Sequence, residues 1–235
     1  MKDSEYKRKY YSADDVVDNY DEFRFKNRGG RYVHEQEVQA VEKFLGDVDR
    51  QGMTLDIPVG TGRLIPTMQT MGFKSLCGAD YSPSMLAYSK NKYQNILLSR
   101  QDAFNTAYSA DTFSAIISLR FFFHYADISK LLKEFRRLVK KDGCVILDTI
   151  VWSPRAWTSL FAERLGGKMY TYSDENFTEI ARQQGFKVER VEKILLVPSF
   201  FYNFMPSFMI SFIKTIEKFA PKRLFTKSIW KLTPI

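Results

Sequence analysis

A short segment with two glycines is the pattern in this sequence that points most directly to ligand chemistry. The apolar run of residues 55–59 leads into Gly60-Thr61-Gly62, and Arg63 then begins a helical pattern. Glycine lets a backbone approach a ligand closely because it has no Cβ, and the first turn of the following helix offers unpaired N–H groups. We therefore expect Gly60 and Gly62 to border a ligand, although a Gly-x-Gly turn alone is common.

Asp80 stands where a carboxylate at a strand end could meet the same ligand. It ends the apolar run of residues 74–80, twenty residues after Gly60. In dinucleotide-binding folds a carboxylate at this spacing accepts hydrogen bonds from ribose hydroxyls; the alternative is that Asp80 caps the helix after Ser82. Those folds also carry a third glycine, and the bulky Ile65 at that position counts against a dehydrogenase.

His124 and Arg120 are the residues that we expect nearest to catalysis. Both lie in residues 118–125 (Ser-Leu-Arg-Phe-Phe-Phe-His-Tyr), directly after an apolar run, where ligands bind in such folds. Histidine can take up a proton near neutral pH, so His124 is the leading candidate for a general base, and Arg120 could orient an acceptor. The alternative for His124 is a structural role with backbone partners.

Short apolar runs alternate with helical patterns around these residues. Strands are predicted at residues 53–58, 74–80, 95–99, 113–119, 144–150 and 186–197. Helices are predicted at residues 63–71, from the Ser82-Pro83 cap, over 127–138, and from Ser173 with Gly185 near its end; Asp142-Gly143 is predicted to turn into the fifth strand. This alternation predicts an α/β fold with a mostly parallel sheet.

Composition and charge favour one folded domain with a basic tail. The chain has 235 residues, 45% of them hydrophobic, and a net charge of +8. The excess charge lies after residue 204, where Glu217 stands against Lys214, Lys218, Lys222, Arg223, Lys227 and Lys231. Such a tail could touch anionic lipid or nucleic acid, but we favour a solvated helix face, and we expect no nucleic-acid partner.

Residues 194–213 are uncharged and long enough to cross a bilayer, yet Pro198 and Pro206 interrupt them. A strand followed by an amphipathic helix from Pro206 fits better. The aromatic residues of this region are expected either in the core or along an acceptor pocket: Phe200, Phe201, Tyr202, Phe204 and Phe208. Because the start of the sequence contains no signal-peptide pattern, we expect a cytoplasmic protein that could contact a membrane peripherally through its tail.

Cys77 and Cys144 each lie within an apolar run that reads as a buried strand. Two isolated cysteines indicate neither a disulfide framework nor a zinc site. Only two histidines accompany them, so a transition-metal centre would need an unusual set of carboxylates. We therefore expect no metal.

Four motifs follow one another along residues 55–143. They are Leu-Asp-Ile-Pro-Val-Gly-Thr-Gly (55–62), Gly-Ala-Asp-Tyr-Ser-Pro-Ser-Met-Leu (78–86), Gln-Asp-Ala-Phe (101–104) with residues 111–117, and residues 132–143. In this order they resemble the class I S-adenosylmethionine-dependent methyltransferases, in the branch related to the ubiquinone and menaquinone biosynthesis methylases. Pro58 replaces that family's first glycine. The resemblance covers about residues 20–185 and implies a Rossmann-like, doubly wound, seven-stranded sheet with helices on both faces.

The resemblance also implies which residues hold S-adenosylmethionine. Asp56 and the backbone at Gly60 and Gly62 would hold its methionine end, and Leu119 would contribute a backbone contact near the sulfonium. Asp80 would bind the ribose and Tyr81 would flank the adenine. Asp102 would accept a hydrogen bond from the adenine amino group, while the Ala103 N–H meets the ring. The family's branch often carries an arginine and a histidine where Arg120 and His124 stand.

Residues before the first strand also resemble this branch, in Asn-Tyr-Asp-Glu-Phe-Arg (19–24) and Gly-Gly-Arg-Tyr (29–32). A lid there would place Tyr20 or Arg31 near the cofactor carboxylate, since arginine suits bidentate binding of carboxylates. The alternative is a solvated N-terminal helix. We thus expect a helical lid over residues 1–50, a cofactor-binding core over 51–200 and a basic, aromatic-rich helical tail over 201–235.

The leading hypothesis is an enzyme that transfers a methyl group from S-adenosylmethionine to a small or lipid-like acceptor. The alternatives are a non-catalytic nucleotide-binding or membrane-associating module and, with less support, an NAD-dependent oxidoreductase. The preferred cofactor distinguishes these enzyme classes.

Overall fold

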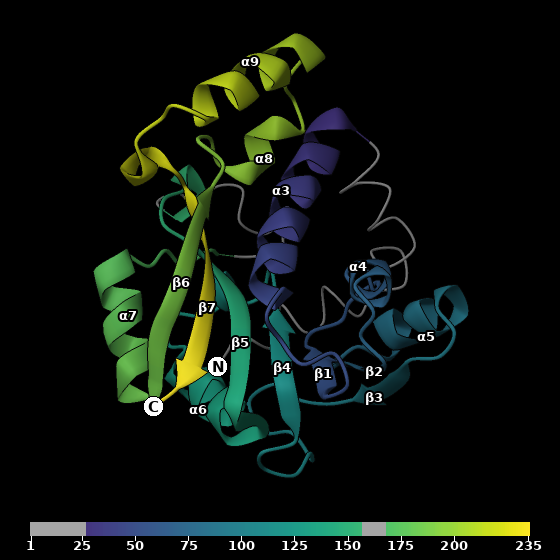
Figure 1. Ribbon diagram of the computed structural model, residues 1–235. Coiled ribbons are helices and arrows are strands. Elements are labelled where there is room, and N and C mark those ends of the chain that lie inside the picture. Colours follow the sequence, from purple (N-terminus) through teal and green to yellow (C-terminus); the bar gives the residue numbers. More distant parts are fainter. Residues whose placement is uncertain (1–26, 157–167) are drawn as a thin grey trace.

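The computed structural model describes residues 27–156 and 168–235, which build a seven-stranded sheet of order β3-β2-β1-β4-β5-β7-β6 (Figure 1). The strands β1 to β5 pair in parallel, and β7 is antiparallel to both of its neighbours. This arrangement confirms the predicted mostly parallel, seven-stranded α/β sheet. The strands are β1 (Met53–Asp56), β2 (Ser75–Asp80), β3 (Leu97–Arg100), β4 (Phe113–Ser118), β5 (Val139–Ile150), β6 (Phe186–Ile194) and β7 (Lys227–Pro234).

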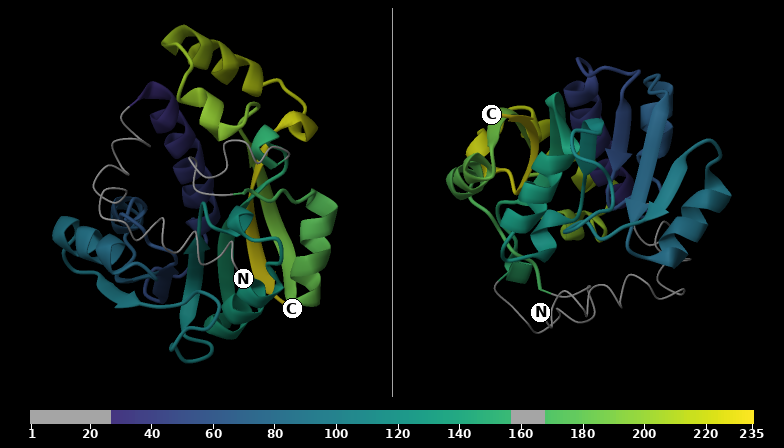
Figure 2. Two further views of the ribbon diagram at one scale, coloured as in Figure 1. Left: turned by 180° about the vertical axis from the view of Figure 1, so that it is seen from behind. Right: turned by 90° about the horizontal axis from the view of Figure 1, so that it is seen from below.

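Helices cover both faces of the sheet and enclose a core on each. The helices are α3 (Arg28–Leu45), α4 (Ile65–Thr70), α5 (Pro83–Lys92), α6 (Ser129–Leu138), α7 (Asp174–Gln183), α8 (Ser199–Tyr202) and α9 (Ser207–Glu217). Helices α6 and α7 pack on one face, and α3, α4 and α8 on the other (Figures 1 and 2). Adjacent residues of a strand point to opposite faces, so Ile116 belongs to the first core and Ile117 to the second.

Several predicted local signals are present in the structure. The Ser82 side chain accepts a hydrogen bond from the Met85 N–H and Pro83 opens α5; Ser173 accepts one from the Asn176 N–H at the start of α7. Gly185 follows the C-cap of α7 with a φ of 82°, a conformation that glycine adopts without strain. Cys77 and Cys144 are buried free cysteines in β2 and β5, as predicted.

The prediction of a helical tail over 201–235 is wrong for its last part. Residues Lys227–Pro234 form β7, which lies between β5 and β6. Lysines in this segment indicated solvent exposure, but Lys227 is paired with Glu37 and Asp148 at 2.5 Å, and Lys231 is paired with Asp47 at 2.5 Å. Paired in this way, both lysines are buried in the sheet.

Two further predictions concern the turn at Asp142-Gly143 and the uncharged segment of residues 194–213. Asp142 and Gly143 lie within β5, where the pairing with β4 shifts register, and not in a turn before it. The predicted strand after residue 186 ends at Ile194, and α9 confirms the predicted helix after Pro206. None of the helices in residues 27–156 and 168–235 has the length and hydropathy needed to cross a bilayer.

Candidate active site

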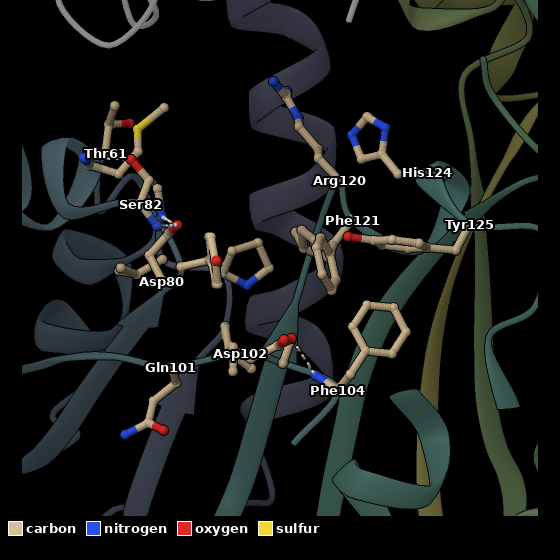
Figure 3. Close-up of a pocket in the computed structure, with 18 of the residues that line it drawn as sticks. Thr61, Asp80, Ser82, Gln101, Asp102, Phe104, Arg120, Phe121, His124 and Tyr125 are labelled. Carbon is tan, nitrogen blue, oxygen red and sulfur yellow. Dashed lines mark hydrogen bonds between the residues drawn. The ribbon is translucent and has the colours of Figure 1, made fainter. Parts of the chain in front are cut away.

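The loops after β1, β2, β3 and β4 surround a pocket (Figure 3). These strands are parallel, so their carboxyl ends meet at one edge of the sheet, where ligands bind in open α/β folds. Asp80 and Ser82 lie on one side of the pocket and Asp102 lies at its base in this view, while Arg120 and His124 lie on the opposite side. Residues far apart in the sequence are thereby brought together as predicted.

Gly60 is the glycine that faces the pocket. Its φ of 53° suits glycine, and a Cβ placed on it would meet no atom within 4 Å. Gly62 has a different role, because a Cβ there would lie 2.6 Å from both the Ile65 side chain and the Tyr93 ring. Gly60 therefore offers backbone to a ligand, whereas Gly62 allows the loop to pack against α4 and Tyr93.

Asp80 both shapes the glycine loop and lines the pocket. Its Oδ2 atom accepts a hydrogen bond from the Gly60 N–H and its Oδ1 atom accepts one from the Ser82 N–H, both at 2.9 Å. Burial raises the pKa of Asp80, and the hydrogen bonds from Ser82 and Gly60 partly offset this effect. Ser82 and not Asp80 caps α5, whereas the Asp80 carboxylate stabilises the backbone turns and remains in the wall of the pocket.

Asp56, at the end of β1, lies behind this wall and is 3% exposed. Burial raises the pKa of Asp56 to about 7; the positive charge of Arg63 lowers it and the negative charge of Asp80 raises it further. The carboxyl group can therefore change its charge near neutral pH, close to the loop that we predict to hold the methionine end of the cofactor.

Residues after β2, β3 and β4 form the base and sides of the pocket. The Asp102 Oδ1 atom accepts a hydrogen bond from the Phe104 N–H at 3.1 Å, which holds the carboxylate in the loop after β3. Tyr81 is 38% exposed at the pocket, and the Arg100 guanidinium stacks on its ring at 5.3 Å. Ala103 and Leu119 also line the pocket and are 7% and 6% exposed. Ala103 is the residue predicted to contact the adenine ring, and Leu119 is the residue predicted to lie near the sulfonium.

The other end of the pocket is aromatic. Tyr125 packs edge-on against Phe104 and Phe121, with ring centroids 4.9 and 5.1 Å apart (Figure 3). The Tyr172 hydroxyl donates to the Tyr125 carbonyl at 2.5 Å and anchors this wall. His124 belongs to the 3-10 helix η1 (Phe122–His124) and lines the pocket beside these rings. A polar end and an aromatic end therefore share one cavity.

Arg120 leaves β4 with a φ of 61° and enters a buried cluster of charges. Its guanidinium pairs with Glu37 at 2.9 Å, and its backbone N–H donates to Asp148 Oδ1 at 2.7 Å. Glu37 also pairs with Arg63 at 3.0 Å and with Lys227 at 2.5 Å. We call these five residues the Glu37 cluster; its three cations and two carboxylates leave one positive charge beside the pocket.

Glu37 is the centre of this cluster and is fully buried. Burial alone would raise its pKa, but the charges of Arg120, Lys227 and Arg63 outweigh this and hold the pKa well below its usual range. Sequence reasoning missed Glu37, Asp148 and Lys227. The available signal was a carboxylate on the apolar face of a helix, in α3, and another inside the apolar strand β5.

Residues 55–147 match a protein family described as "Methyltransferase domain". This match shows a methyltransferase-like domain over residues 55–147, which are less than half of the chain. Curated relatives are the demethylmenaquinone methyltransferases of Chlorobaculum parvum and Chlorobaculum tepidum, each 29% identical over 99 residues. These alignments cover 42% of this chain and 41% of each relative, so the match spans less than half of their length.

Solved methyltransferase structures share the fold. Magnesium protoporphyrin IX methyltransferase from Synechocystis PCC 6803 with bound S-adenosylhomocysteine has a TM-score of 0.68 at 18% identity, covering 97% of either chain. Geranyl diphosphate C-methyltransferase from Streptomyces coelicolor has a TM-score of 0.68 at 12% identity, covering 87% of this chain and 80% of that one. These matches confirm the predicted family resemblance and fold, and the Synechocystis and Streptomyces structures contain S-adenosylhomocysteine, the demethylated form of the predicted cofactor.

The pocket of this methyltransferase domain fits such a cofactor. The open space at Gly60 admits a ligand against the backbone, and the Asp80 and Asp102 carboxylates face the same cavity. Asp56 is buried and Gly62 packs against Ile65 and Tyr93, so neither is part of the pocket lining. The roles of the individual residues stay predictions.

The predicted lid residues are placed only in part. Tyr20 lies outside the described residues. Arg31 is exposed in the first turns of α3 and is not part of the pocket lining. Gly29 has a packing role, because a Cβ there would lie 1.7 Å from the Tyr202 carbonyl oxygen in α8. Gly29 therefore permits close contact between α3 and α8.

Proposed function

We propose that this protein transfers the methyl group of S-adenosylmethionine to a small or lipid-like acceptor. The observation that carries the proposal is one cavity with two chemically different ends. One end presents the backbone of Gly60 and the carboxylates of Asp80 and Asp102; the other presents aromatic rings, Arg120 and His124. Polar groups suit a nucleoside with an amino-acid tail, and aromatic walls suit an apolar acceptor.

Each polar residue has a defined task in this proposal. Asp80 accepts hydrogen bonds from the ribose hydroxyls, Asp102 accepts one from the adenine amino group, and Tyr81 covers the ring. Gly60 lets the methionine end lie against the loop. When bound, S-adenosylmethionine supplies a methyl group that is already electrophilic, so the protein mainly aligns the acceptor and removes its proton.

His124 is the base in this proposal. The methyl group replaces a proton on the acceptor, and the His124 imidazole takes up that proton. Arg120 orients the acceptor from the same loop, with its guanidinium held by Glu37. The lipid-like class of acceptor is supported by the aromatic wall and by relatives named for demethylmenaquinone and geranyl diphosphate.

Calorimetric titration with S-adenosylmethionine and S-adenosylhomocysteine tests the cofactor site. We expect wild-type protein to bind both, and Asp80→Asn to weaken binding by about 30-fold, because hydrogen bonds to a charged acceptor contribute roughly 1.5–3 kcal/mol. Asp142→Ala, which removes an exposed carboxylate in β5, is the matched control and should bind like wild type. Binding of NAD(H) in preference to S-adenosylmethionine would contradict the proposal.

Transfer of radiolabelled methyl to a panel of isoprenoid quinones and other apolar acceptors tests the reaction. With an acceptor in hand, His124→Gln should lower the rate by roughly 10²–10⁴ without changing cofactor affinity, since only the proton-accepting group is lost. An unchanged rate would remove His124 from catalysis and leave its structural role.

A further inference from the structure

Helix α9 carries two apolar stripes, and only one of them faces the protein. Ile210 and Ile213 belong to the core on the α3 side of the sheet. Phe208 and Phe212, spaced four residues apart, are 73% and 66% exposed, and Phe219 just beyond the helix is 84% exposed. Residues at this spacing share one side of a helix. The outer stripe therefore faces away from the domain, at the outer edge of the molecule (Figure 1).

The neighbouring segment extends this apolar surface. Phe204, between α8 and α9, is 74% exposed, and its ring packs edge-on against Phe200. Met209 and Leu224 are also exposed. Single exposed apolar residues are ordinary, but a group of aromatic rings on one short segment marks an interaction site.

The charged side chains exposed on α9 and in the segment just after it are basic. Lys218 and Arg223 are exposed, and Lys214 lies over the Tyr32 ring at 5.8 Å. Glu217, the acidic residue of α9, is turned inward: it accepts hydrogen bonds from the Tyr202 hydroxyl at 2.8 Å, the Leu196 N–H at 2.9 Å and the Tyr32 hydroxyl. The outer side of α9 therefore offers aromatic rings and positive charge without its carboxylate.

This surface lies at the same edge of the sheet as the pocket. The chain enters α8 and α9 from the carboxyl end of β6, and β6 runs in the same direction as β5 because both are antiparallel to β7. The pocket is bounded by the carboxyl ends of β1 to β4. The views in Figures 1 and 2 show α9 beyond this edge of the sheet. A flat partner that covers α9 would thus lie at the edge of the sheet that holds the pocket.

We propose that α8 and α9 form a docking surface for an anionic lipid bilayer. Phe204, Phe208, Phe212 and Phe219 enter the boundary between headgroups and acyl chains, and the basic side chains contact lipid phosphates. Aromatic rings are favoured at this boundary, and positive charge adds attraction to anionic lipid. A solvated helix face would place its lysines outward but not its phenylalanines. The proposal does not depend on the cofactor site.

Sedimentation of the full chain with vesicles tests this surface. We expect binding to vesicles of phosphatidylcholine with phosphatidylglycerol, and weaker binding to phosphatidylcholine alone. The triple variant Phe208→Ser/Phe212→Ser/Phe219→Ser should lower the partition coefficient at least about tenfold. Lys214→Glu/Lys218→Glu should remove the preference for anionic vesicles. Point substitutions are needed because truncation of the tail would also remove β7.

Leu97→Ser is the matched control, because Leu97 is an equally exposed apolar residue on β3, outside this surface. It should bind vesicles like wild type. Failure of the wild type to bind anionic vesicles, or equal binding by the triple variant, would overturn the proposal. A wild-type dimer that the triple variant abolishes, without vesicle binding, would assign the surface to a second copy of the chain. Calorimetry with S-adenosylmethionine on the same variants checks the pocket separately.

Discussion

The Glu37 cluster and the outer stripe of α9 both depart from the usual placement of side chains: the first buries charged residues, and the second exposes aromatic ones. In the cluster, five charged residues lie together under α3, and Glu37 and Asp148 have no exposed side-chain surface. On α9, Phe208 and Phe212 are mostly exposed, although aromatic side chains normally fill cores. Both regions border the edge of the sheet where the pocket lies.

The two regions differ in where their stabilising partners are. Each charge in the Glu37 cluster has an opposite charge within the domain, supplied by α3, β5, β7 and the loops after β1 and β4. The outer stripe of α9 has no comparable cover among the described residues. The buried charges of the cluster are therefore stabilised by partners within the domain, whereas the exposed aromatic residues of α9 indicate a partner outside it.

Breaking the cluster should have the largest effect on stability. Glu37→Gln leaves Arg120, Arg63 and Lys227 without their shared carboxylate, and removal of one partner from a buried ion pair costs about 3–5 kcal/mol. Urea denaturation of the variant and the wild type measures the difference in unfolding free energy.

The matched control is Glu179→Gln, which breaks an ion pair with Arg182 on the exposed surface of α7. Exposed pairs of this kind contribute little to stability because water screens them, so the control should unfold like wild type. Equal losses in the two variants would show that the cluster is no more than a set of surface-like pairs.

Helix α9, which has eleven residues, allows a buried and an exposed apolar side chain to be compared within one element. Ile210→Ala removes a side chain that is 6% exposed and should cost about 2 kcal/mol, whereas Phe212→Ala should change stability by less than about 0.5 kcal/mol. Thermal or urea unfolding in the absence of vesicles measures both. A large loss for Phe212→Ala would mean that the outer stripe packs against protein after all.

Asp56 is a useful contrast to Glu37, because it is also a buried carboxyl group but its pKa is raised and not lowered. Burial raises its pKa to about 7, so folding strengthens proton binding, and the stability of the folded state decreases as the pH rises from about 4 to 7. Asp56→Asn should flatten this decrease by roughly 2 kcal/mol. Unfolding free energies at pH 5 and pH 8 measure it, and identical pH profiles would refute the assignment.

The sequence was sufficient to predict the parallel part of the sheet and the position of the pocket. The inner strands β1, β2 and β4 are mostly buried on both faces and therefore read as short apolar runs, as in residues 113–118. Helix starts at Ser82 and Ser173 carry local hydrogen-bonding signals that need no tertiary context. Gly60, Asp80, Asp102 and Arg120 follow strand ends, and parallel strands bring those ends together.

The features that the sequence did not predict depend on partners distant in the chain. Lys227 and Lys231 indicate exposure by themselves, but they are buried against carboxylates distant in the chain, among them Glu37, Asp148 and Asp47. Likewise, the amphipathic pattern of α9 does not show which apolar stripe faces the domain. The spacing of apolar residues predicts which side chains share one face of a helix, but it does not predict what that face packs against.

The position of β7 also sets an order for assembly. Strand β6 joins the sheet only through β7, and β7 is synthesised after it. Until the ribosome has released residues 227–234, the outer edge of β5 therefore has no neighbouring strand to pair with, and open strand edges favour association with other chains. Lys227 enters the Glu37 cluster when β7 joins the sheet, so this strand also completes the charge pairing beside the pocket.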